Sequence, residues 1–259
     1  MEQLTSGDAT LAIDPSHGAR LTSLSIAGLE LLVPPTANTF HWGCYPMAPW
    51  AGRIRYGRFE FDGRDYQLPL TMPPHAIHGT TYNRPWRRYN GAASFDIDLG
   101  PDWPFPGRAV QHFRLGPNRL DLTMEIHSDS EPFPASAGWH PWFQRQLGRG
   151  EPAQLSIQAD SMYARDEHHM ATDRLIPPPP GPWDDCFVGV RQPVEILWPG
   201  ALRLCMEADV QHWVVYNEPE HAFCVEPQSA PPDALNIEPR LVTPEAPLTL
   251  NASLHWEIL

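Results

Sequence analysis

Six stretches of the chain combine histidine, arginine or carboxylate side chains with aromatic or glycine neighbours. They read "APWAGRIRYG", "PPHAIHGTTYNRPW", "SAGWHPWFQR", "MYARDEHHMATDR", "GPWDDCFVG" and "HAFCVEPQSAPPDALN". Histidine exchanges a proton near neutral pH, and carboxylates accept protons or hydrogen bonds from hydroxyl groups. Aromatic rings beside such groups suit a sugar, because its C–H surfaces stack on the rings while its hydroxyls bond to the polar side chains. These residue types therefore make a sugar one candidate ligand.

Two other kinds of site fit the spacing less well. The pairs His75/His78 and His168/His169 lack the spacing of helical zinc sites, and the chain has no G-x-S-x-G nucleophile elbow. His168 and His169 are interpreted as solvated loop residues. The four cysteines are far apart and form no CxxC pair, so we expect buried free thiols: Cys44, Cys186, Cys205 and Cys224. The residues predict no metal site.

The overall charge and the N-terminal sequence limit the partners. The net charge is −13, which disfavours binding to a phosphate backbone, because such binding needs clustered lysine and arginine. No apolar run is long enough to span a membrane. The first residues, "MEQLTSGDATLAID", show neither the basic nor the apolar region of a signal peptide. We therefore expect a cytoplasmic protein that binds a small molecule, and the sequence leaves the oligomeric state open.

The elements that must position these residues are predicted to be short strands. Proline accounts for 31 of 259 residues, more than twice the usual share of about 5%, which leaves little room for long helices. Alternation of apolar and polar residues recurs in "RFEFDGRDYQL" and "LDLTMEIHS", and Asp62-Gly63 in the first of these predicts a hairpin turn. The segment "IPPPPGPWDD", residues 176–185, reads as a rigid loop, with a domain boundary as the alternative. The pattern predicts one all-β domain over residues 1–259.

Taken in order, these stretches resemble the aldose 1-epimerase (galactose mutarotase-like) family over almost the whole chain. "LAIDPSHGARLTSLSIAGLELL" is similar to the family's first hairpin, and "APWAGRIRYGRFEFDGRDYQL" resembles the segment that carries a sugar-contacting arginine. "AIHGTTYNRPW", "WHPWF", "WDDCF" and "CVEPQSAPPDALN" resemble its two histidine motifs, its aspartate motif and its glutamate motif. The "HPWF" form departs from the better-known galactose mutarotases and resembles a bacterial branch that includes hexose-6-phosphate mutarotase-like proteins.

The resemblance implies a large antiparallel β-sandwich of the galactose mutarotase type. It also implies interconversion of the α and β anomers of a free aldose without metal or organic cofactor. By motif match, Glu226 is the expected general base, His140 the general acid, and His78 a second histidine near the ring oxygen or anomeric hydroxyl. His75 ranks lower because glycine follows His78 instead.

The same resemblance assigns substrate-binding residues. Arg53 is expected to donate hydrogen bonds to sugar hydroxyls, and Asp184 to accept them, with Asp185 as the fallback. Trp139 is a candidate stacking face, as are Trp86 and Trp142. Core packing is the default interpretation for all three tryptophans.

The residues around Glu226 fit the role of a base. An apolar run, residues 222–225, precedes Glu226, and Pro227 follows it. Proline favours extended geometry in the residue before it, so Glu226 is predicted to end a buried strand. Burial would raise its pKa above the usual value of about 4.3 and so make it a stronger base. A hexose-6-phosphate mutarotase and a non-catalytic sugar-binding protein are the alternative functions.

Overall fold

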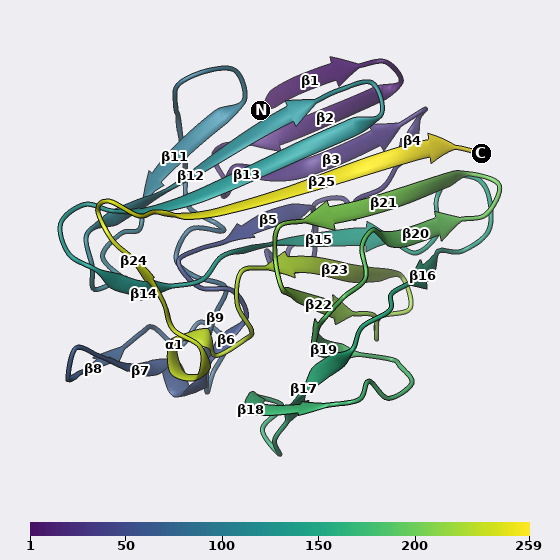
Figure 1. Ribbon diagram of the computed structural model, residues 1–259. Coiled ribbons are helices and arrows are strands. Elements are labelled where there is room, and N and C mark those ends of the chain that lie inside the picture. The colour runs from purple at the N-terminus through teal and green to yellow at the C-terminus, as the bar shows by residue number, and fades with distance from the viewer.

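The computed structural model describes residues 1–259, which form mainly antiparallel strands in two large sheets (Figure 1). The first sheet has eleven strands in the order β1-β2-β3-β5-β15-β23-β22-β19-β17-β18, and β4 pairs with β3. Its strands are β1 (Glu2–Ser6), β2 (Ala9–Asp14), β3 (Arg20–Ile26), β4 (Leu29–Glu30), β5 (Cys44–Met47), β15 (Gly138–Gln144), β17 (Ser161–Arg165), β18 (Ala171–Ile176), β19 (Asp184–Val188), β22 (His212–Tyr216) and β23 (Ala222–Gln228).

The second sheet has eight strands in the order β10-β11-β12-β13-β25-β21-β20-β16. They are β10 (Arg87–Arg88), β11 (Ser94–Asp98), β12 (Gly107–Leu115), β13 (Arg119–Ser128), β16 (Gln154–Ser156), β20 (Val194–Trp198), β21 (Leu202–Ala208) and β25 (Leu248–Ile258). In β13 every second side chain, from Leu120 to Ile126, is buried while those between are partly exposed, because successive side chains of a strand point to opposite faces.

The core lies between the two sheets. Apolar side chains from both sheets form one buried cluster of 54 residues, in which tryptophans and phenylalanines are the largest members. Each sheet thus covers the apolar face of the other, as expected for two packed layers. The predicted antiparallel β-sandwich is confirmed.

Smaller elements gather at one end of the sandwich (Figure 1). They are β6 (Arg53–Ile54) with β9 (Ala76–Ile77), β7 (Arg58–Phe61) with β8 (Arg64–Gln67), β14 (Phe133–Ala135) with β24 (Arg240–Val242), the 3₁₀ turn η1 (Arg55–Gly57) and the helix α1 (Ala234–Ile237). The predicted hairpin is confirmed: β7 and β8 pair across Asp62 and Gly63, whose φ angles are 51° and 70°. Two positive φ angles define the turn type that matches strand twist.

The proline-rich segment, residues 177–183, connects β18 to β19. Both strands belong to the eleven-stranded sheet, so the segment is a loop within one sheet. No helix of the chain has the length and apolar character needed to cross a bilayer.

Candidate active site

A cavity of about 320 Å³ opens on the face of the eleven-stranded sheet that points away from the core. The alternation of β15 explains this placement. Trp139, Pro141 and Phe143 point between the sheets and lie against leucines of the second sheet. The residues between them, His140 and Trp142, point the opposite way and line the cavity.

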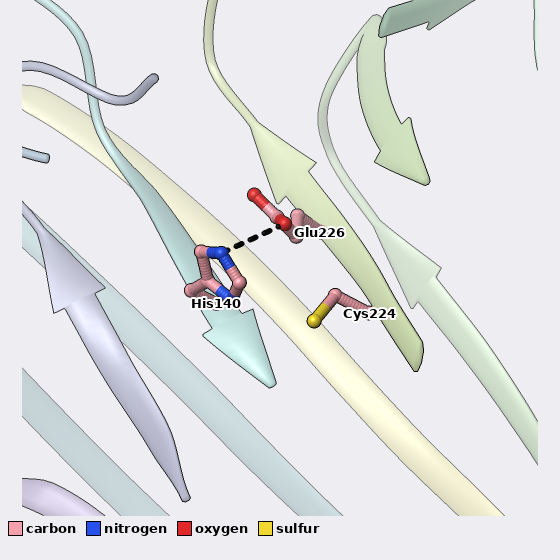
Figure 2. A group of neighbouring side chains, drawn as sticks. All are labelled: His140, Cys224 and Glu226. Carbon is pink, nitrogen blue, oxygen red and sulfur yellow. Dashed lines mark ion pairs between the residues drawn. The ribbon is translucent and has the colours of Figure 1, made fainter. Parts of the chain in front are cut away.

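Three central strands, β5, β15 and β23, carry the proposed chemical groups. The register of β15 with β23 pairs Trp142 with Cys224. The strands are antiparallel, so His140, two residues before Trp142, and Glu226, two residues after Cys224, also face each other. On the other side of β15, Tyr45 of β5 is the partner of His140. The row Tyr45–His140–Glu226 thus crosses the sheet, and Figure 2 shows His140 reaching from its strand toward Glu226.

Glu226 is held at both carboxylate oxygens. Its Oε1 lies 3.1 Å from His140 Nε2, and its Oε2 accepts a 3.0 Å hydrogen bond from Gln228 Nε2. The residue is only 2% exposed. Burial, followed by the negative charge of Asp184, raises the pKa of Glu226 well above its usual range, while the Gln228 bond and the Arg53 charge oppose that rise. The carboxyl group is therefore a much stronger base than a free glutamate.

Burial acts on His140 in the opposite direction. The pKa of His140 lies well below its usual value because of burial first, and then because of His78 and the Arg20 charge. Burial thus favours the uncharged forms of both His140 and Glu226. Moving one proton across the 3.1 Å between Oε1 and Nε2 converts the uncharged pair into a carboxylate and an imidazolium. The pair is arranged for proton exchange.

His78 completes this group from a loop after β9. Its ring meets the His140 ring edge-on, with centroids 5.0 Å apart. Burial and the Arg53 charge lower the pKa of His78 to about 3, so it is a neutral imidazole at physiological pH. Its Nδ1 is buried without a partner. The next residue must be glycine, because Gly79 has φ +77° and a Cβ there would lie 2.0 Å from Ala48 O.

Aromatic rings fix the orientation of His140. Its ring stacks on Tyr45 with centroids 4.7 Å apart and on Trp142 with centroids 5.5 Å apart. Beneath Tyr45 lies Arg20, only 1% exposed, whose guanidinium carbon is 4.6 Å from the Tyr45 ring and 4.0 Å from the Trp42 ring. Arg20 has no carboxylate partner and donates to backbone carbonyls instead. Burial lowers its pKa to about 10, so it remains a cation at neutral pH.

Arginine–aspartate pairs also border the cavity. Arg53 lies 3.6 Å from Asp184, and Arg165 lies 3.9 Å from Asp184 and 2.9 Å from Asp185. All four residues line the cavity. The sequence left the choice between the two aspartates open. Asp184 is the one near Arg53 and is one-quarter exposed, whereas Asp185 is nearly buried against Arg165.

Trp139 does not belong to this site. The expectation that it offers a stacking face to substrate is wrong: it is 1% exposed, lies in the main core and donates its indole N–H to Gln111 Oε1 at 3.0 Å. Trp86 is likewise a core residue, as the default interpretation held. Trp142, one position past Pro141, faces the cavity instead.

The lower-ranked histidines lie at the edge of the site or outside it. His75 accepts a hydrogen bond from the Tyr56 backbone N–H and packs on the Tyr56 ring, so it stabilises a turn. His168 and His169 are exposed loop residues, as predicted, although His169 also borders the cavity mouth.

Three side chains at the site form a donor set of the kind that binds zinc. The donor atoms of His140, Cys224 and Glu226 all lie within 4.8 Å of one another (Figure 2). Zinc needs a thiolate, a carboxylate or a neutral imidazole. Burial, followed by Glu226, raises the pKa of Cys224 well above its usual value. The thiol is thus held protonated, and the cluster fits a proton-exchanging pair better than a metal centre. All four cysteines are free.

The sequence did not single out Gln228 and Tyr45, which line the cavity, or Arg20, which lies beneath Tyr45. Gln228 lies two positions from Glu226, so period-two alternation could have placed it on the same face. Counted from His140, the same alternation favours Trp142 over Trp139 among the candidate stacking residues. Tyr45 and Arg20 carried no comparable signal, because they reach the site through strand pairing and packing between distant segments.

Comparison with known proteins finds relatives along most of the chain. The sequence profile of the family described as aldose 1-epimerase matches residues 3–254. The chain is 28% identical over 163 residues to the uncharacterized protein YihR of Escherichia coli (strain K12), covering 58% of this chain and 53% of the relative. It is 26% identical over 158 residues to galactose mutarotase of Mus musculus, covering 56% and 44%. The matched segments thus span about half the length of these curated relatives.

Solved structures match the fold over its full extent. A putative aldose 1-epimerase from Escherichia coli K12 superposes with a TM-score of 0.86 at 21% identity, covering 99% of this chain and 98% of that one. A galactose 1-epimerase from Lactobacillus acidophilus NCFM superposes with a TM-score of 0.81 at 16% identity, covering 98% and 93%. At such identities the likeness establishes a shared fold.

Proposed function

Because the chain belongs to the aldose 1-epimerase family, we propose that it interconverts the α and β anomers of a free aldose. The observation that carries this proposal is the 3.1 Å contact between Glu226 and His140 at the edge of a small cavity. A cavity of about 320 Å³ is at the lower end of the range for small-molecule sites, about 300–1,000 Å³. It therefore suits a monosaccharide better than a polymer.

The reaction needs two proton transfers, and the site offers one group for each. Glu226, as a carboxylate, removes the proton from the anomeric hydroxyl while His140, as an imidazolium, protonates the ring oxygen and the C1–O5 bond breaks. This step leaves an open-chain aldehyde, a neutral carboxyl group and a neutral imidazole. Rotation about C1–C2 followed by the reverse transfers closes either anomer. Each positioned acid or base contributes about 10²–10⁴-fold.

The environment of the pair supports this exchange. Burial favours neutral Glu226 and neutral His140, which is the state reached after ring opening. The charged pair that starts the reaction therefore gains stability when Glu226 takes up its proton and His140 gives up its own. His78, neutral because the pKa of its imidazole is about 3, is suited to hydrogen bonding at the ring oxygen or anomeric hydroxyl. Arg53 would donate to other hydroxyls, and Asp184 would accept from them.

The charges around the cavity favour a neutral sugar over a phosphosugar. A phosphate group is usually bound by arginine or lysine side chains that are free to contact it. Here an aspartate offsets the positive charge of each arginine, since Asp184 lies 3.6 Å from Arg53 and Asp185 lies 2.9 Å from Arg165. Acidic residues outnumber basic ones in the lining, which contains Arg53 and Arg165 against Asp184, Asp185, Glu218 and Glu226. The free aldose is therefore the preferred substrate class.

The test is an anomer-conversion screen. The optical rotation of freshly dissolved single anomers is followed with and without protein, across free hexoses and pentoses and across hexose 6-phosphates. Faster decay for at least one free aldose, with saturation at high sugar concentration and loss on heat denaturation, supports the proposal. Acceleration of the 6-phosphates alone would replace it with the phosphosugar alternative. Saturable sugar binding with background rates for every sugar would identify a non-catalytic binding protein.

A further inference from the structure

We propose that Gln228 works in the same site as a clamp on Glu226 and as an acceptor for one hydroxyl of the sugar. This inference rests on the proposed anomer interconversion. Gln228 is 1% exposed, lines the cavity and lies two positions after Glu226 on β23, so both side chains leave the same face of the sheet.

The neighbouring strands make room for this side chain. Gln228 pairs with Gly138 of β15 on one side and with His212 of β22 on the other. A Cβ at Gly138 would lie 3.0 Å from Gln228 Cγ and 2.8 Å from Pro227 O. The absence of a side chain at Gly138 therefore lets the glutamine reach across to Glu226.

The amide can face Glu226 in only one way when the carboxylate is charged. A carboxylate only accepts hydrogen bonds, so the amide nitrogen is the atom 3.0 Å from Glu226 Oε2. The other amide atom, Oε1, is buried and has no hydrogen-bond partner in the protein. Most buried polar atoms are paired. A buried, unpaired acceptor beside the cavity is therefore suited to receive a hydrogen bond from a sugar hydroxyl.

The clamp has a defined chemical effect. The bond from Gln228 stabilises the charged carboxylate and so opposes the effect of burial on its pKa. With His140 at Oε1 and Gln228 at Oε2, rotation of the carboxylate would break one contact or the other. Gln228 is thus a positioning residue for the base and, through its own oxygen, a binding residue for substrate.

The first experiment tests the clamp without measuring turnover. The infrared C=O band of protonated Glu226 is isolated by subtracting the spectrum of Glu226→Gln, and its pH midpoint is compared between the wild type, Gln228→Leu and Gln228→Met. Both variants should need a higher pH to ionise Glu226, by about tenfold or more in proton affinity. Gln111→Leu, which removes an equally buried glutamine from the core, should leave the midpoint unchanged. An unchanged midpoint in both Gln228 variants overturns the clamp.

The second experiment tests the acceptor role. The values of kcat/KM are measured for the best aldose and its monodeoxy analogues, with the wild type and with Gln228→Leu. With the wild type, removing one particular hydroxyl from the sugar should lower kcat/KM by about tenfold. With Gln228→Leu, removing the same hydroxyl should change kcat/KM little, because the variant already lacks that hydrogen bond. If the ratio of wild type to variant is the same for every deoxy sugar, Gln228 binds no hydroxyl.

The two kinds of failure can be told apart. If the wild type converts no aldose, the proposed function fails, and the infrared titration still decides whether Gln228 controls Glu226. If the wild type is active but the titration midpoint and the deoxy-sugar ratios are unaffected by Gln228→Leu and Gln228→Met, the inference about Gln228 fails while the function stands.

Discussion

Replacing Glu226 with glutamine should nearly abolish anomer conversion while making the folded protein more stable at neutral pH. The substitution keeps the size of the side chain and removes its ability to accept a proton. The residue is 2% exposed at the edge of the cavity. The change should therefore lower the catalytic rate and raise the free energy of unfolding.

The loss of rate should lie at the upper end of the effect of one catalytic group. A general base contributes about 10²–10⁴-fold. The carboxylate also supplies the negative charge that stabilises protonated His140, against burial, His78 and Arg20, which all disfavour that form. Glu226→Gln therefore weakens both the base and the acid. We expect kcat to fall by about 10⁴-fold, or about 5 kcal/mol in the barrier, with KM changed only a few-fold.

The gain in stability follows from the raised pKa. Between the unfolded pKa near 4.5 and the higher folded pKa, the folded state holds a proton that the unfolded chain has released. Stability therefore falls as pH rises through this window. Glutamine has no such proton to lose. The variant should match the wild type near pH 4 and exceed its free energy of unfolding at pH 7–8.

Polarimetry of a freshly dissolved anomer measures the rate, and urea unfolding at pH 4, 6 and 8 measures the stability. Glu60→Gln is the matched control, because Glu60 is exposed on β7, outside the cavity, and should change neither quantity. Retention of more than about one-tenth of the wild-type kcat would refute Glu226 as the base. A stability difference that does not grow with pH would refute the burial argument.

Four further substitutions test the site and the residues packed behind it. His140→Asn should lower kcat by about 10²–10⁴-fold and leave sugar binding within a few-fold, and an unchanged kcat would remove His140 from the mechanism. Trp142→Phe should raise KM in polarimetry, because Trp142 lines the cavity. Trp139→Phe should keep full activity but lose about 1 kcal/mol of stability in urea unfolding, because its buried hydrogen bond is removed. The reverse pattern would contradict the faces assigned to the two tryptophans. Gly79→Ala should destabilise the fold by more than about 1 kcal/mol in urea unfolding, since its Cβ would lie 2.0 Å from Ala48 O, and a neutral effect would show that this loop can move.

Local sequence patterns predicted the parts of the fold that local chemistry controls. Asp62-Gly63 specified its hairpin, because two residues with positive φ are what a tight strand turn requires. The alternating runs specified strands with one buried face. Neither pattern says which strands become neighbours. The pairing of β5 with β15 and of β15 with β23 joins segments about 80 to 100 residues apart, and such pairings have no local signature.

The tryptophan error shows the same limit at the level of one strand. Alternation in "WHPWF" tells that Trp139 and His140 face opposite sides, so choosing His140 for the cavity already excludes Trp139. Position within a motif is thus a weaker guide to which side chain faces the cavity than alternation along the strand. Arg20 is harder to predict, because nothing near it in the sequence shows that an arginine would be buried and stacked on Tyr45 without an acidic partner.

The site also lies where two prolines interrupt the backbone pairing. His140 precedes Pro141 and Glu226 precedes Pro227, on neighbouring strands in the middle of the sheet, where proline is normally excluded because it has no N–H to donate. Because Pro227 favours extended geometry in the residue before it, Glu226 was predicted to end its strand. That prediction was wrong by two residues, since β23 continues to Gln228.

The strand continues because β22 pairs with it on its other side as far as Gln228. On the β15 side, side chains make contacts where the prolines remove backbone bonds. Backbone pairing stops two residues before His140 and resumes two residues after it. In between, the side chains of His140 and Glu226 meet at 3.1 Å, and Gln228 holds the other carboxylate oxygen. Each proline also restricts the residue before it to extended geometry, which limits the direction in which both side chains leave the sheet. The prolines of the His-Pro and Glu-Pro dipeptides thus remove backbone N–H donors at the point where side chains, not backbone bonds, join the two strands. They also hold the two proton-exchanging groups opposite each other.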